Sequence, residues 1–320
     1  MRVTNVCMKF SSRFGRSLQR LFSSVASVPP PLKHRHLVIG LGAMKTGTTW
    51  LSDYLASHPQ FFHSPVKEMN SFAVIFPYNH VYPDYFYGPW PELLLWRMEN
   101  TILRYGNRRS AYSDFIWNQG KGFDEIRALA QLNKITSTAD YLQYFEERIG
   151  GYLHFGEISP CYAQLPAEAF ACMSTLCNDV RFIFVMRDPT RRAISHIRQL
   201  RLRIHKELEI QDLLDRVDPS DAVFIRSDYR YTLATLRTLG LAERTKFLIY
   251  EDLFTQECIN DLCDWLGLCR HPASFKKRVN NGSGDQFTAA QLENLRARLC
   301  PIYDDLRHEP LTQAAHTWLW

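Results

Sequence analysis

The sequence lacks long hydrophobic runs and the cysteine spacings of metal or disulfide-rich domains. None of its apolar stretches approaches the roughly 18 residues of a membrane-spanning helix, so we expect a soluble body. Its eight cysteines form no CxxC pair, and no histidine pair has zinc-finger spacing. Cys258, Cys263 and Cys269 lie near His271, but the sequence LCDWLGL there indicates an amphipathic helix. We therefore expect reduced core cysteines and no bound metal.

The first 36 residues contain no acidic residue. Their basic residues are separated by aromatic and aliphatic residues, and three consecutive prolines stand at positions 29–31. The basic residues are Arg2, Lys9, Arg13, Arg16, Arg20, Lys33 and Arg35. The segment also lacks the apolar core of about 7 to 15 residues found in secretory signals. We expect residues 1–35 to be a basic, disordered leader of a cytoplasmic protein. A transit peptide and a helix that contacts a membrane surface through residues 1–30 are the alternatives.

Composition predicts one large α/β domain. The chain has 320 residues, of which 46% are hydrophobic and 22% charged, enough for a sizeable core. We place the domain at residues 36–310 and a short tail at 311–320. The formal charge of +5 is mild, and the basic residues are scattered or lie in motifs. A pocket for a polyanionic ligand explains this excess, so we expect no nucleic-acid partner.

Residues 37–55 read LVIGLGAMKTGTTWLSDYL, which predicts a buried strand, a glycine-rich turn and the start of a helix. Glycines let successive backbone N–H groups point at one anion, and the helix adds the positive end of its dipole. The side chains that add charge or hydroxyl donors are Lys45, Thr46, Thr48 and Thr49. This stretch therefore predicts a phosphate site, with an ordinary glycine turn as the alternative.

The position of the lysine distinguishes this loop from the nucleotide triphosphatase P-loop, in which lysine directly follows the last glycine. Here Lys45 stands two residues before Gly47. The sequence KTGTTWL resembles the 5′-phosphosulfate loop of sulfotransferases that use 3′-phosphoadenosine 5′-phosphosulfate (PAPS). The resemblance implies cofactor contacts from Lys45, Thr46, Gly47, Thr48, Thr49 and Trp50. Trp50 either packs against the adenine or fills the core.

A second motif follows at residues 180–199, VRFIFVMRDPTRRAISHIRQ. It predicts a buried strand at 182–186 with Arg187 at its carboxyl end, where open α/β sheets bind ligands. The planar fork of arginine suits phosphate. The stretch resembles the sulfotransferase pattern RDPxxRAxS, which implies that Arg187 and Ser195 bind the 3′-phosphate. We expect Arg191 and Arg192 to be helix-surface charges, although Arg192 matches the second arginine of the family pattern.

Residues 61–72, FFHSPVKEMNSF, resemble the segment after the phosphosulfate loop in heparan-sulfate-type and related bacterial sulfotransferases. There a Lys-Glu pair precedes an aromatic, which implies that Glu68 is the catalytic base and that Lys67 contacts the acceptor. A surface carboxylate is the alternative for Glu68. The family usually has two phenylalanines shortly beyond the pair, whereas this chain has Asn70, Ser71 and Phe72.

Three further stretches extend the resemblance. The sequence EISPCY implies that Glu157 and Ser159 shape the acceptor pocket, although Glu157 could equally satisfy backbone donors. The aromatic-rich residues 73–120 predict loops that form either the acceptor wall or a satellite core. The basic loop at 276–284 resembles the loop that closes over the 3′-phosphate, with Arg278 as the contact. Secondary structure is predicted as a third strand over 247–253 and helices near 137–149, 227–240 and 288–306.

The resemblance covers roughly residues 36–308 in the family's motif order. It implies a single α/β domain whose central parallel sheet is flanked by helices, the P-loop-kinase-like sulfotransferase fold. The implied activity is transfer of a sulfuryl group from PAPS, without metal, to a hydroxyl or amine of a small molecule or saccharide, or of a glycolipid. Glu68 is the expected base, and Lys45 stabilises the leaving bisphosphate. A P-loop small-molecule kinase and a degenerate, non-catalytic binding protein with this fold are the alternatives.

Overall fold

The computed structural model describes residues 31–77, 95, 97–99, 121–203, 205–275, 286–312, 315 and 318. The leader over residues 1–30, most of the aromatic stretch 73–120, and Arg278 lie outside these ranges. The description begins at Pro31, and the short 3₁₀ helix Leu32–His34 already packs Leu32 into the core. No helix in the described ranges is long and apolar enough to cross a membrane.

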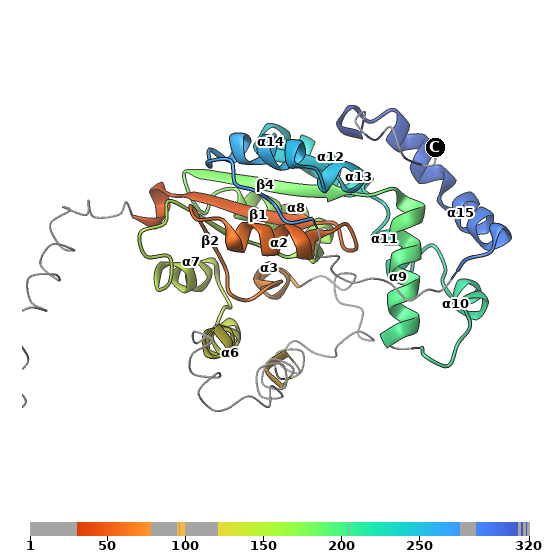
Figure 1. The fold of residues 1–320 in the computed structure, drawn as a ribbon, viewed down its shortest axis with the longest axis horizontal. Coiled ribbons are helices and arrows are strands. Elements are labelled where there is room, and N and C mark those ends of the chain that lie inside the picture. Colours follow the sequence, from red (N-terminus) through yellow and green to blue (C-terminus); the bar gives the residue numbers. More distant parts are fainter. Residues whose placement is uncertain are drawn as a thin grey trace, which may run out of the picture.

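The centre of the fold is a five-stranded parallel sheet in the order β2-β3-β1-β4-β5 (Figure 1). The strands are β1 (His36–Gly42), β2 (Phe61–His63), β3 (His154–Ile158), β4 (Asp179–Met186) and β5 (Thr245–Ile249). The predicted α/β class with a central parallel sheet is confirmed. Because β1 lies in the middle, its carboxyl end delivers the glycine-rich turn to the centre of one sheet edge.

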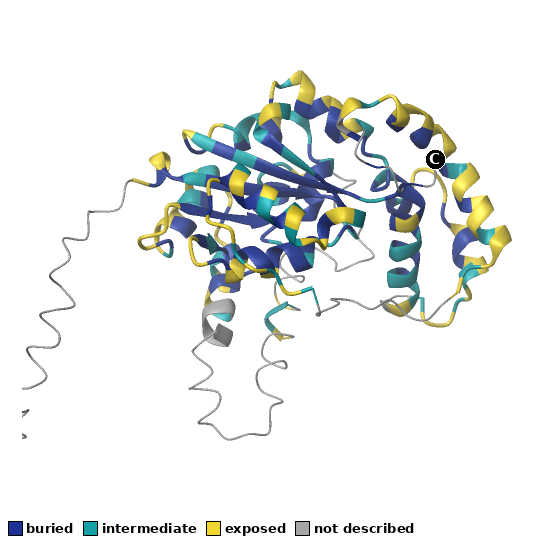
Figure 2. Cartoon of the chain, turned by 45° about the horizontal axis from the view of Figure 1, so that its top comes forward, coloured by how far each residue is buried: buried dark blue, intermediate teal, exposed yellow. Residues whose placement is uncertain are grey.

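Both faces of the sheet are covered, which explains the long apolar runs in β1 and β4. Successive side chains of a strand point to opposite faces. Val38, Ile183 and Val185 pack on one face with α2 (Thr48–Ser57), α13 (Tyr250–Leu253) and α14 (Gln256–Leu266). Figure 2 shows the strands buried, while the outer helices expose their solvent faces.

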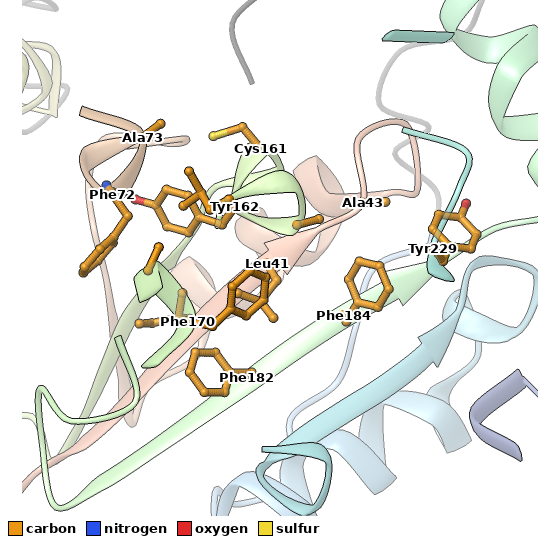
Figure 3. Packing of buried hydrophobic residues seen from close by; sticks show 14 of the residues in the cluster. Leu41, Ala43, Phe72, Ala73, Cys161, Tyr162, Phe170, Phe182, Phe184 and Tyr229 are labelled. Carbon is orange, nitrogen blue, oxygen red and sulfur yellow. Dashed lines mark hydrogen bonds between the residues drawn. The ribbon is translucent and has the colours of Figure 1, made fainter. Parts of the chain in front are cut away.

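The other face carries the larger core. Phe182 and Phe184 of β4 pack there with Phe170 and Tyr162, as Figure 3 shows. The covering helices are α3 (Ser71–Ile75), α6 (Lys121–Leu132), α7 (Thr138–Glu146), α8 (Ala167–Met173), α9 (Pro189–Arg203), α10 (Ile210–Arg216), α11 (Ala222–Ile225), α12 (Arg230–Thr238) and α15 (Ala289–Arg307). Of these, α9, α10 and α15 lie beyond the carboxyl ends of the strands (Figure 1). They therefore border the edge at which the predicted motifs emerge.

Several predicted elements are confirmed with small shifts. The helix after the glycine-rich turn is α2, and the last predicted helix is α15. Ser137 and Thr288 each begin a helix with a capping box, in which the side chain accepts a backbone N–H three residues on. The hydroxyl that precedes each apolar pattern therefore marks the helix start correctly.

One predicted strand ends at the wrong residue, and one strand was not predicted. The third strand ends at Ile249 rather than at residue 253, because Tyr250–Leu253 forms the short helix α13. Glu251 and Asp252 lie in its first turn, where negative charge favours a helix start. The strand β2 was not predicted, since a strand of three residues is too short to show an alternating pattern.

Candidate functional site

The glycine-rich turn between β1 and α2 has the geometry of an anion-binding loop. Gly47 precedes α2 with a left-handed backbone (φ 82°), and Lys45 is also left-handed (φ 71°). The buried Thr46 fixes the turn by donating its hydroxyl to the carbonyl of Ala43 at 2.6 Å. The first N–H groups of a helix have no acceptor within it, so those of α2 can bind an anion.

Trp50 lies in the core beneath this loop. Its indole donates to the carbonyl of Ser274 at 3.0 Å, and its ring stacks on Phe275 with centroids 5.5 Å apart. This packing fits the alternative of a core residue, and a contact with a nucleotide stays a prediction. Trp50 also ties α2 to the chain directly before residues 276–285, which include Arg278 and lie outside the described ranges.

Arg187, at the carboxyl end of β4, reaches the anion loop from the neighbouring strand. Its guanidinium donates to the carbonyl of Lys45 at 3.3 Å and lies over the ring of Tyr250 at 4.2 Å. The Tyr229 hydroxyl accepts from the backbone N–H of Arg187 at 3.3 Å and donates to its carbonyl at 2.8 Å. The structure thus brings together the two motifs that the sequence separates by about 140 residues.

The arginines of α9 differ from their prediction. Arg191 is exposed as expected, but Arg192 is completely buried, so its assignment as a surface charge is wrong. Its guanidinium donates to the hydroxyl of Ser227 at 2.8 Å and to the carbonyl of Val223 at 2.7 Å, which makes burial feasible. Ser195, one turn further along α9, is half-buried.

Lys67 and Glu68 lie beside the anion loop. The Lys67 ammonium is 3.1 Å from the Glu68 carboxylate and also donates to the hydroxyl of Thr49. Arg97 donates to the carbonyls of both residues, at 2.7 Å in the case of Glu68. The Glu68 side chain is 39% exposed. A carboxylate that solvent can reach therefore stands next to the predicted phosphate site.

Glu157 and Ser159 lie behind the Glu68 segment rather than on an open wall. Glu157 is 1% exposed and accepts the Ser159 hydroxyl at 2.6 Å, while that hydroxyl accepts the backbone N–H of Asn70 at 2.9 Å. Burial raises the pKa of Glu157 to about 7, although hydrogen bonds from Ser159, Tyr162 and the Met69 backbone oppose the rise. This geometry favours the structural alternative for Glu157, and its contact with an acceptor stays a prediction.

Backbone strain is concentrated in the same two loops. Among the described residues other than glycine, left-handed φ angles occur at Lys45, Glu68 and Asn70. Each such residue costs about 1–3 kcal/mol, and strain of this kind clusters at functional sites. Sequence reasoning gave Asn70, Tyr229 and Tyr250 no supporting role, although the stretches that contain the two tyrosines resemble family segments. Asparagine tolerates left-handed angles better than most residues, but this preference alone would not have identified Asn70.

The described parts of the chain hold no group of three or more His, Cys, Asp or Glu side chains that could bind a metal ion. Among the described residues, the positive groups of the site include Lys45, Lys67 and Arg187, which come from three different loops. The arrangement therefore combines backbone amides and cations for an anion with one accessible carboxylate for a proton.

Comparison with solved structures identifies similar folds. A sulfotransferase from Alicyclobacillus acidocaldarius superposes with a TM-score of 0.51 at 20% identity, covering 86% of this chain and 95% of that one. The sulfotransferase domain of the curacin biosynthetic pathway gives 0.45 at 19% identity, with coverages of 75% and 76%. The sulfotransferase domain of the Synechococcus PCC 7002 olefin synthase gives 0.45 at 16% identity, with coverages of 88% and 98%.

Comparison with protein-family models and with curated sequences finds no match. The structural similarity to the Alicyclobacillus enzyme spans nearly the whole of both chains. At this level of identity it concerns the arrangement of the backbone and not the reaction. The chain therefore has the α/β fold found in sulfotransferases.

Proposed function

We propose that this chain is a sulfotransferase that moves a sulfuryl group from PAPS to a hydroxyl or amine acceptor. The observation that carries the proposal is the position of Lys67. Its ammonium contacts both Thr49 of the anion loop and the carboxylate of Glu68. A group bound at the loop and an acceptor bound at Glu68 would therefore meet at one point, as transfer requires.

The chemistry of the donor set fits PAPS. The loop amides, Lys45 and the threonine hydroxyls suit the 5′-phosphosulfate, while Arg187 and Ser195 suit the 3′-phosphate. Arg187 retains a buried Nε donor without a hydrogen-bond partner among the described residues. An unused buried donor is costly, and an anion at this place would satisfy it. Arg278, Gly47 and Trp50 remain proposed contacts.

Each step of the transfer has a group to assist it. Glu68 accepts the proton of the acceptor as the acceptor oxygen or nitrogen forms its bond to sulfur. The bond between sulfur and the bridging oxygen of the 5′-phosphate breaks, and its electron pair remains on that oxygen. Lys45 and the loop amides stabilise the negative charge that develops there. The step needs no metal and no change of oxidation state.

The proposed acceptor is a saccharide or a glycolipid. A carboxylate base suits hydroxyls and amines that do not ionise by themselves near neutral pH. Lys67, Glu157 and Ser159 are the residues proposed to contact the acceptor or to hold the segment that does. The buried position of Glu157 supports the second of these roles.

Thermal denaturation of the full chain with nucleotides tests the proposal. We expect adenosine 3′,5′-bisphosphate to raise the melting temperature without magnesium, because a ligand at 100 times its Kd adds about 2.7 kcal/mol of stability. ADP should have a smaller effect. Stabilisation by ADP only in the presence of magnesium would support the kinase alternative instead, and no response to either nucleotide would contradict a nucleotide site.

Turnover of PAPS in the Glu68→Gln variant tests the base. We expect kcat to fall by about 10² or more, with bisphosphate binding unchanged, because general-base catalysis is typically worth 10² to 10⁴. Glu243→Gln is a control, since Glu243 lies at the opposite end of the sheet in the short 3₁₀ helix before β5. Unchanged turnover in Glu68→Gln would remove this residue from the mechanism. If the wild type binds the bisphosphate but transfers no sulfuryl group to any acceptor, the non-catalytic alternative is favoured.

A further inference from the structure

Arg192 carries a positive charge into the interior without a carboxylate to neutralise it. The residue is 0% exposed, and its acceptors are the Ser227 hydroxyl, the Val223 carbonyl and the Nδ1 of His196 at 3.2 Å. Its Nη1 has no partner among the described residues. All three acceptors are neutral, because burial holds the pKa of His196 well below its ordinary value.

A buried charge without a counter-charge is expensive for the folded state. The cost is visible at Arg192, whose pKa is lowered to about 9, mainly by burial and also by the neighbouring charges of Arg226 and Arg187, while Tyr229 opposes the change. The hydrogen bonds of Arg192 join α9 to Val223 and Ser227, but they leave its positive charge without a carboxylate partner. The charge therefore calls for a functional explanation.

Arg192 lies next to the second proposed anion site. It follows Arg187 by five residues and precedes Ser195 by three, which places Arg192 and Ser195 on adjacent turns of α9. Its partner Ser227 stands two residues before Tyr229, whose hydroxyl binds the Arg187 backbone. Arg192 is thus connected to Arg187 through the turn that carries Tyr229.

Two carboxylates close to Arg187, those of Asp188 and Glu251, have other partners. Asp188 accepts the Tyr303 hydroxyl at 2.8 Å and the backbone N–H of Arg191 at 2.8 Å. Glu251 accepts the backbone N–H of Asp188 at 3.4 Å and the indole N–H of Trp318 at 3.2 Å. Neither carboxylate hydrogen-bonds to Arg192, so its positive charge can act on an incoming anion.

We propose that Arg192 is a positioning and specificity residue whose buried charge favours a nucleotide with a dianionic 3′-phosphate over the same nucleotide without one. The inference rests on the proposed function and assigns to Arg192 part of the selectivity for the nucleotide cofactor. Arg192 does not touch the ligand. It acts through the dry interior, where charge interactions are stronger and salt screens them little.

Loss of the charge should not disrupt the fold. Ser227 also donates its hydroxyl to the carbonyl of Val223 at 2.8 Å, so both groups keep a partner when Arg192 is removed. Replacing a buried charge by an apolar residue of similar volume is often neutral or stabilising. We therefore expect Arg192→Met without ligand to melt at the wild-type temperature or higher.

The test compares binding of adenosine 3′,5′-bisphosphate and of adenosine 5′-monophosphate by calorimetry in the wild type, Arg192→Met and Arg191→Met. Arg191→Met removes the same charge from an exposed neighbour on the same helix. In Arg192→Met we expect the preference for the bisphosphate to fall by about tenfold or more, at low and at high salt alike. Arg191→Met should keep the wild-type preference at high salt.

Arg192→Lys and Arg192→Gln separate charge from shape. Lysine keeps the charge and should keep most of the preference, whereas glutamine keeps a polar contact and should lose it; the glutamine variant also replaces Arg192→Met if that variant does not fold. An unchanged preference in both neutral variants overturns the inference, as does an equal loss in the lysine variant. A wild type that does not bind the bisphosphate contradicts the proposed function itself.

Discussion

Glu68 and Glu157 are two carboxylates in connected loops with different surroundings. Glu68 is 39% exposed and pairs with Lys67, whereas Glu157 is buried and its pKa is raised to about 7. The Ser159 hydroxyl links Glu157 to the backbone of Asn70, two residues after Glu68. The protonation state of Glu157 therefore bears on the loop that holds the proposed base.

Glu157 should make the stability of the fold depend on pH. A carboxyl group whose pKa is higher in the folded than in the unfolded chain contributes its full stability below pH 4.5 and loses it as the pH rises through 7. We expect this group to lower the free energy of unfolding by about 3 kcal/mol across that range. Buried histidines such as His63 and His154, whose pKa values are lowered to about 4, act in the opposite direction over this range. Urea denaturation at a series of pH values should therefore show the loss as the difference in stability between the wild type and Glu157→Gln.

Glu168→Gln is the matched control for Glu157→Gln, because Glu168 is exposed at the start of α8. Its stability should follow the wild-type curve. Identical pH profiles for the wild type and Glu157→Gln would mean that Glu157 ionises normally in the folded chain.

At the residue scale, local motifs could be read from the sequence and long-range contacts could not. The anion-loop residues, Arg187 and the Lys-Glu pair form motifs, and the structure places them at one edge of the sheet. The burial of Arg192 was missed because the adjacent Arg191 and Arg192 were both assigned to the helix surface, although Arg192 alone matches the second arginine of the family pattern. The partner of Arg192, Ser227, lies 35 residues further along the chain. The left-handed backbone at Lys45 and Glu68 has no signal in residue type.

The pairing of β1 with β3 depends on one glycine. A methyl group added at Gly156 would stand 1.9 Å from the carbonyl oxygen of Val38, its register partner on β1. The two backbones approach too closely there for any side chain. β3 contains Glu157 and leads directly to Ser159, so this spacing also sets the position of the support for the Glu68 loop.

Gly156→Ala should therefore destabilise the chain severely. We expect a loss of about 3 kcal/mol or more, at the upper end of the range for overpacked cores. The melting temperature of the variant measures this loss. Gly151→Ala serves as the control, because nothing lies within 4 Å of the added methyl group there. Equal melting temperatures for the two variants would contradict the close approach of β1 and β3.

At the element scale, long apolar runs and capped helices were predictable. β1 and β4 could be predicted from their apolar runs, because both faces of these strands are buried. The end of β5 was placed wrongly because the apolar pattern continues into α13, where only the acidic pair at residues 251–252 marks the change. The short strand β2 owes its conformation to its hydrogen bonds with β3 and not to any local pattern.

For the whole molecule, we propose that residues 1–30 add contact with a membrane surface to a domain that folds without them. The first described residues make their own contacts with the rest of the domain. Leu32 is buried, and Arg35 donates to the carbonyls of Gly150 and Tyr152 at 2.8 Å each. A chain that starts at Pro31 retains these contacts.

Removal of residues 1–30 should leave stabilisation by the bisphosphate unchanged and abolish binding to anionic vesicles. This segment contains five basic residues, Arg2, Lys9, Arg13, Arg16 and Arg20. Each basic residue near an anionic surface adds about 1 kcal/mol to binding. Sedimentation with phosphatidylserine vesicles measures binding, and neutral phosphatidylcholine vesicles are the control. Equal sedimentation of the full and shortened chains would mean that residues 1–30 do not bind the membrane surface.

The central position of β1 divides the proposed site into two parts that lie on opposite sides of this strand. Residues 61–70 and 154–159, on the β2–β3 side, hold Glu68 and its supports, while β4 and β5 carry Arg187 and Tyr250 on the other side. Among the described residues of the site, only those in the loop after β1 belong to both parts. Under the proposed function, mutations on the β2–β3 side can change which acceptor binds during evolution while the residues that bind the nucleotide stay the same. Descendants of one ancestral chain would then differ in product while sharing one sulfuryl donor.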